Sequence, residues 1–111
     1  MLSEKMEKAV DVISGEIHDS KEYVELERQR KIVKSSPEAK ELIERARSIQ
    51  KRLMDIPEDD MNGDYAESLQ NEYEEISENT VVYDYSRAES ALVTLVREVI
   101  GSIIDNIDIE I

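Results

Sequence analysis

The chain contains no cysteine, no tryptophan and no phenylalanine, and its 111 residues include only three glycines and two prolines. The absence of cysteine excludes disulfides, thiol catalysis and cysteine-ligated zinc or iron–sulfur centres within this chain alone. The scarcity of glycine and proline suits long helices and disfavours a turn-rich β-fold. Because aromatic residues make up only 5%, we expect a core of aliphatic side chains, methionine and tyrosine.

The chain also lacks the run of about 18 uninterrupted apolar residues that a membrane helix needs. Its longest apolar stretch, Ala91–Ile104, is broken by Arg97 and Glu98. The first residues, Met1–Lys8, carry charges of both signs and no signal-peptide pattern. We therefore expect a cytoplasmic protein. We also expect a single domain over residues 1–106, because a chain of this length can bury one modest core but not two.

Acidic residues outnumber basic residues by 27 to 14, so the formal net charge is −13. Residues 28–52 are an exception, with nine basic and three acidic side chains. Two interpretations are open: solvated helix faces with pairing inside the chain, or a basic hairpin that docks an acidic partner or the acidic half of a sister subunit. The candidate partner-binding residues are Arg28, Arg30, Lys31, Lys34, Arg45, Arg47, Lys51 and Arg52.

Apolar residues recur at steps of three and four along five segments, a spacing typical of amphipathic helices. The segments cover about residues 3–18, 20–34, 37–56, 64–78 and 80–105. Side chains suited to helix N-caps stand at their starts: Ser3, either Asp19 or Ser20, Ser36, and either Asn79 or Thr80. We predict an all-α fold, a five-helix bundle of long antiparallel amphipathic helices. The last helix is expected to fray from about Asp105, with residues 107–111 as a frayed acidic tail.

The last segment is apolar over much of its circumference, and such a helix is either central in its fold or part of an oligomer interface. We expect both roles for it. Gly15 lies inside the apolar stripe of the first segment, where it would let another helix approach closely. The residues predicted for an interface between copies are Leu92, Val96, Val99, Ile100 and Ile103.

No set of residues has the spacing of a catalytic site. The loop from Glu58 begins like a calcium-binding loop, but its twelfth position is Leu69, where a bidentate acid is required. The single histidine, His18, lacks the acid three residues earlier that a di-iron bundle uses. We therefore expect no enzyme activity and no metal or other cofactor. A metal-dependent enzyme is the alternative, and elemental analysis tests it.

Direct binding of nucleic acid is not expected, because the net negative charge repels phosphates over the molecule as a whole. The basic segment contains no aromatic residue, and Tyr83-Asp84-Tyr85 has an acid between its rings, so neither suits base stacking. An RNA-associated factor that contacts RNA through residues 28–52 stays open as an alternative.

Three motifs resemble, in their order and spacing, the YlbF/YmcA family of small bacterial helical proteins. They are Ser20-Lys21-Glu22-Tyr23, the run Ser35–Ile43 and the run Asn79–Tyr85, and the resemblance extends over roughly residues 4–106. It implies a compact all-helical fold that self-associates. It also implies a non-enzymatic regulator of competence, biofilm formation and sporulation in Gram-positive bacteria.

The resemblance implies assembly with a sister YlbF/YmcA-like protein and a YaaT-like protein, and an influence on mRNA processing by ribonuclease Y. Complexes of this family can carry iron–sulfur clusters on cysteines. This chain has no cysteine, so no such cluster is expected on it. An uncharacterised paralogue with a separate scaffold role is the alternative within the family.

Overall fold

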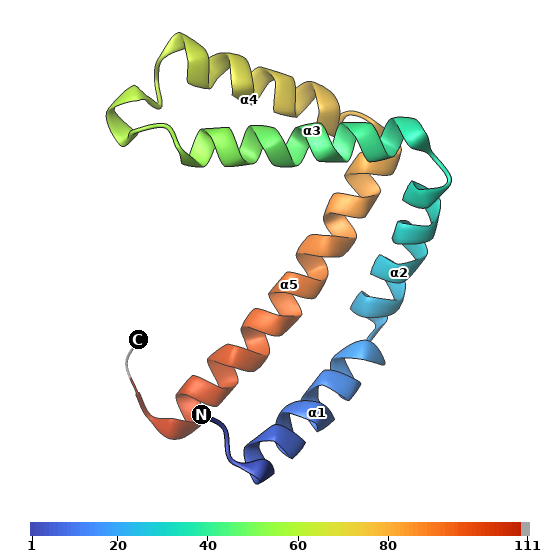
Figure 1. Ribbon diagram of the computed structural model, residues 1–111, viewed down its shortest axis with the longest axis vertical. Coiled ribbons are helices and arrows are strands. Elements are labelled where there is room, and N and C mark those ends of the chain that lie inside the picture. Colours follow the sequence, from blue (N-terminus) through green and yellow to red (C-terminus); the bar gives the residue numbers. More distant parts are fainter. Residues whose placement is uncertain (110–111) are drawn as a thin grey trace. The chain divides into compact units, whose positions relative to one another are not determined.

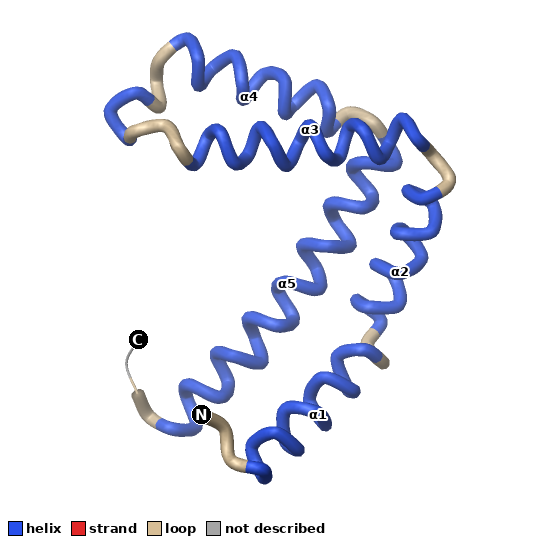
Figure 2. The backbone as a smooth tube through the Cα atoms, in the orientation of Figure 1, coloured by secondary structure: helices blue, strands red, loops and turns tan. Residues whose placement is uncertain are grey.

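The computed structural model describes residues 1–109 and shows a chain of helices joined by short loops (Figures 1 and 2). Within these residues there is no strand, and no helix combines the length and apolar composition needed to cross a membrane. The prediction of an all-α fold with five helices is confirmed. The elements are α1 (Glu4–His18), α2 (Lys21–Lys34), α3 (Pro37–Met54), the 3-10 turn η1 (Glu58–Asp60), α4 (Asp64–Ser77) and α5 (Thr80–Ile107).

Four helices begin at the caps that the sequence predicts. In each case the side-chain oxygen of the cap accepts a hydrogen bond of 3.1–3.2 Å from the backbone N–H three residues later. Pro37 follows one of these caps at the start of α3, where its missing N–H has no intrahelical partner to lose. The four capping residues are Ser3, Ser20, Ser36 and Asn79.

The end of α5 differs from the prediction of fraying from about Asp105. The helix continues to Ile107, and Asp108 then adopts left-handed backbone with φ of 57°, which a short polar side chain tolerates. An acid at a helix C-terminus costs only about 0.3–1 kcal/mol. That is too little to end a helix of 28 residues early. Residues 110–111 of the predicted tail lie outside the described residues.

The chain divides into two compact units, and each is described by itself. Unit 1 combines Met1–Arg28 with the chain from Arg87 onward, and unit 2 is Gln29–Ser86. Helices α2 and α5 therefore each contribute residues to both units. The arrangement of all five helices in one bundle, with α5 at its centre, stays a prediction.

In unit 2, α3 and α4 pack side by side as a helical hairpin (Figure 1). Tyr65, which the periodicity places in the apolar stripe of α4, is 54% exposed, and its neighbour Ala66 is buried instead. The small side chain lets the backbones of two packed helices approach more closely than a tyrosine would. The buried residues of the two helices are Ala39, Ile43, Ile49, Ala66, Leu69 and Ile76.

In unit 1, α1 has no buried residue. Most of its predicted apolar stripe is exposed, including Met6 and Val10, and only Ile17 is half-buried. A Cβ added at Gly15 would meet no atom within 4 Å, so the expected close approach of another helix is wrong for the described chain. The stripe of α1 is therefore largely a surface rather than part of a core.

Candidate interaction surface

The basic segment 28–52 was the predicted partner-binding surface, and several of its cations contact groups of the same chain. Arg28 donates two hydrogen bonds to the Glu25 carboxylate one turn earlier in α2, at 3.0 and 2.7 Å. Arg45 of α3 lies 2.6 Å from the carboxylate of Glu72 in α4. Both pairs are partly exposed, so each contributes about 0–1 kcal/mol to stability. Each pair places a cation of the basic segment in contact with a carboxylate of the same chain.

A third cation, Arg47, donates a hydrogen bond of 3.0 Å to the hydroxyl of the buried Tyr85. The cations of α2 come before α3 in the chain. Those in the last turn of α3 lie about 20 Å from the start of that helix. The binding of a partner by the basic segment stays a prediction. The other exposed cations predicted for this surface are Arg30, Lys31, Lys34, Lys51 and Arg52.

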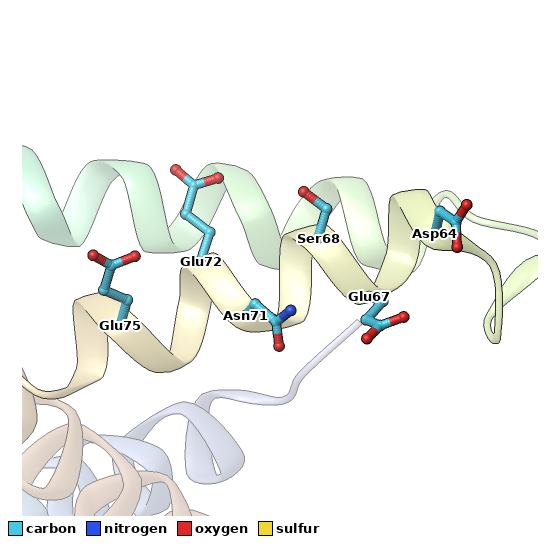
Figure 3. Close-up of a pocket in the computed structure, with 6 residues that line it drawn as sticks. All are labelled: Asp64, Glu67, Ser68, Asn71, Glu72 and Glu75. Carbon is cyan, nitrogen blue, oxygen red and sulfur yellow. The ribbon is translucent and has the colours of Figure 1, made fainter.

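One face of α4 is acidic and lines an open polar hollow of about 390 Å³ (Figure 3). The carboxylates of Glu67 and Glu72 point away from one another, and Glu72 is engaged by Arg45. Among residues 1–109 no group of three or more histidine or acidic side chains is placed to hold a metal ion. The arrangement is that of a solvated acidic surface. The residues lining the hollow are Asp64, Glu67, Ser68, Asn71, Glu72 and Glu75.

The loop that begins like a calcium site closes through backbone hydrogen bonds. Glu58–Asp60 form the 3-10 turn η1, and the amide of Gly63 donates to the carbonyl of Asp60 at 3.0 Å. Gly63 then lies in extended backbone, with φ of −76° and ψ of 167°, as the N-cap of α4. The loop thus connects the helices of the hairpin.

The part of α5 that belongs to unit 1 carries apolar side chains on two faces. At about 100° per residue, these faces lie about 90° apart around the helix. The inner face is buried or half-buried, and it contains Ala88, Leu92, Leu95 and Val99. The second face, here called the outer seam, alternates steps of three and four, and it contains Val93, Val96, Ile100, Ile103 and Ile107.

Four of the five side chains in the outer seam are between 42% and 57% exposed, and only Val96 is half-buried. The residues predicted for an interface between copies are split between the two faces. Leu92 and Val99 belong to the inner face, and the other three belong to the outer seam. The prediction did not include Val93 and Ile107, the two ends of the seam, although each lies seven residues from Ile100 in its middle.

The inner face of α5 lies against other parts of unit 1. A groove of about 340 Å³ there is lined by Ile13 and Ile17 of α1 together with Leu95 and Val99 of α5. Polar side chains of α1, α2 and the turn between them line the rest of the groove. The inner face of α5 thus lines a groove together with α1, whereas most of the outer seam is exposed to solvent over the residues described.

The sequence of the chain matches the sequence model of a protein family described as control of competence regulator ComK, YlbF/YmcA. The match covers residues 6–108 of the 111 residues. No curated protein and no solved structure matches the chain.

Proposed function

Because the chain belongs to the YlbF/YmcA family over residues 6–108, we propose that it is a non-enzymatic regulatory or adaptor protein. The family description names control of the competence regulator ComK, so competence is the first process in which we expect it to act. Biofilm formation, sporulation and ribonuclease Y-dependent mRNA processing belong to the same proposal. The protein would act by binding other proteins.

The observation that carries the proposal is the outer seam of α5. Contiguous apolar patches larger than a few hundred Å² are rare on soluble monomers and mark sites that bind another molecule, and the outer seam is an exposed apolar face. Four of its residues are 42–57% exposed, and they follow the alternating three- and four-residue steps with which helices pack on other helices. A surface of this kind supports recognition of a protein rather than conversion of a substrate.

The proposed partners are a second copy of the chain, a sister YlbF/YmcA-like protein, a YaaT-like protein and ribonuclease Y. The alternative of direct RNA binding through residues 28–52 receives less support. Arg28, Arg45 and Arg47 each contact a group of the same chain, and the whole chain has a formal net charge of −13.

Deletion of the gene in its host, followed by complementation with the wild-type gene, tests the regulatory role. We expect the deletion to lower transformation frequency and to change the abundance of transcripts that ribonuclease Y processes, and complementation to restore both. Growth rate and the level of ribonuclease Y serve as controls. A deletion strain with unchanged transformation and unchanged transcripts would contradict the proposal.

Binding assays with purified proteins test the partners separately from the pathway. Each of the three proposed partners other than a second copy of the chain is immobilised in turn, and the chain is added at low and high salt. An RNA-associated factor would instead retain RNA at low salt and lose it steeply as salt rises, since counterion release governs such binding. Retention of RNA without any protein partner would overturn the proposed mode of action.

A further inference from the structure

We propose that Asn62 is a site of spontaneous covalent modification, where the side-chain amide is converted to a carboxylate through a cyclic imide with Gly63. The two residues are exposed and lie between η1 and α4, in the loop that connects the helices of the hairpin. Asparagine is among the thermally labile residues. The reaction needs only these two residues and water, so it is independent of the proposed regulatory role and of any partner.

The reaction begins with attack of the backbone on the side chain of Asn62. The nitrogen of Gly63 loses its proton to water and forms a bond to Cγ of Asn62, and the bond from Cγ to Nδ2 then breaks. Ammonia leaves with a proton from solvent, and a cyclic imide remains. Water opens this ring at one of its two carbonyl groups. The product is aspartate with the ordinary linkage, or isoaspartate, in which the side-chain carbon has entered the backbone.

The loop both exposes the reacting groups and controls their reaction. Gly63 has no Cβ that would shield its nitrogen, and the side chain of Asn62 makes no hydrogen bond within residues 1–109. The N–H of Gly63 donates to the carbonyl of Asp60 at 3.0 Å, so this turn must open before the nitrogen can lose its proton. Exposed loops open at a small cost in free energy. We therefore expect the native chain to react, and to react more slowly than the denatured chain.

The other three asparagines of the chain are held in ways that oppose the same attack. The side chain of Asn79 accepts a hydrogen bond of 3.1 Å from the amide of Val82 as the cap of α5. Asn71 lies within α4 and Asn106 within α5, where helical hydrogen bonds fix the backbone. Each of the three is also followed by a residue whose side chain crowds the attacking nitrogen. Asn62 is therefore the asparagine that the fold leaves reactive.

Isoaspartate at position 62 would change the start of α4. It adds one carbon atom to the backbone before Gly63, so the hydrogen bond between Gly63 and the carbonyl of Asp60 cannot keep its geometry. Gly63 is the N-cap of α4, and its carbonyl accepts a hydrogen bond of 3.1 Å from the amide of Glu67. The first turn of α4 should therefore loosen. Aspartate with the ordinary linkage should not have this effect, because an acid is favourable near a helix N-terminus.

Peptide mapping by mass spectrometry measures the reaction in the native chain during incubation in mildly alkaline buffer. The peptide with Asn62 should gain the mass of an amide-to-acid exchange, and its isoaspartate should accept a methyl group from a protein isoaspartyl methyltransferase. Peptides with Asn71 and Asn106 should stay unchanged and serve as internal controls.

Two variants test the chemistry of the site. Asn62→Gln should abolish the reaction, because the longer side chain would have to close a larger ring; the residue is exposed and outside the left-handed region, so glutamine fits. Gly63→Ala should slow the reaction several-fold. Its Cβ would lie 3.2 Å from the carbonyl oxygen of Asp60, which requires only a small adjustment of the loop.

Hydrogen exchange tests the consequence for α4. The amides of residues 63–67 should exchange faster in the isoaspartate fraction than in the unmodified chain. Asn62→Asp carries the same added charge with the ordinary linkage, so it should exchange like the unmodified chain.

Each outcome decides the inference. If Asn62 converts in the denatured chain but not in the native chain, the turn protects it and the proposal is wrong. Conversion of Asn71 or Asn106 as fast as Asn62 overturns the assignment to the loop. Unchanged exchange at the start of α4 in the isoaspartate fraction overturns the structural consequence.

Discussion

Replacing Ile49 with alanine tests whether the buried side of α3 stabilises unit 2. Ile49 is only 3% exposed and lies on the same face of α3 as the other buried residues of that helix. The substitution removes three carbon atoms, each worth about 0.8 kcal/mol of transfer free energy. The cavity left behind adds to this loss, so we expect the free energy of unfolding to fall by about 2.5–4 kcal/mol.

Urea denaturation followed by far-UV circular dichroism measures this change, because the signal of an all-helical chain is large. The matched control is Met54→Ala on the same helix, where the side chain is 85% exposed and removing it should change stability by about 0.5 kcal/mol or less. A domain has a total stability of about 5–15 kcal/mol, so the core variant should lose a large share of it. If Ile49→Ala costs no more than Met54→Ala, the assigned core of α3 is wrong.

Three further experiments test individual contacts by the same denaturation assay. Ser36→Ala removes the cap of α3 and should cost about 1 kcal/mol, whereas Ser36→Asp should retain most of the stability; equal losses in both variants would argue against capping. A double-mutant cycle on Arg45 and Glu72 should give a coupling of at most about 1 kcal/mol that decreases with salt, and a larger salt-independent coupling would contradict an exposed pair. Tyr85→Phe removes the hydroxyl that accepts a hydrogen bond from α3 and should cost about 0.5–1.5 kcal/mol; no loss would show that this bond contributes nothing.

The helix starts were predictable because each depends on residues close together in sequence. The cap at Ser36 needs only its own hydroxyl and the amide of Ala39, and Pro37 supports it by its fixed backbone. The same holds at Asn79, whose side chain accepts from the amide three residues later. Capping hydrogen bonds between residues three apart can therefore be predicted from the sequence without knowledge of the tertiary contacts.

Burial within each helix was less predictable, because the partner helix decides it. Tyr65 and Ala66 both fit the apolar periodicity of α4, and only packing against α3 buries the alanine and exposes the tyrosine. Gln29 is 4% exposed although nothing in its sequence neighbourhood distinguishes it from the exposed polar residues of α2. Periodicity identifies a face about a hundred degrees wide, but not its centre.

The partners of charged side chains were also not predictable from the sequence. A count of charges along the sequence identified the basic segment 28–52, but it could not show that Arg45 meets Glu72, 27 residues away on another helix. The apolar outer seam of α5 was visible in the spacing, since Val93, Ile100 and Ile107 recur every seven residues. The spacing could not show that α1 lines a groove with the inner face of α5 and not with the outer seam.

The most direct test of the account is complementation of the deletion strain with Ile100→Asp, at a protein level equal to that of the wild type. Transformation frequency is measured beside strains that carry the wild type or the control Thr94→Asp, an exposed residue of the same helix about 140° from the centre of the seam. The account predicts that the wild type and the control restore transformation and that Ile100→Asp does not. Full restoration by Ile100→Asp would contradict the claim that the protein acts through the outer seam of α5.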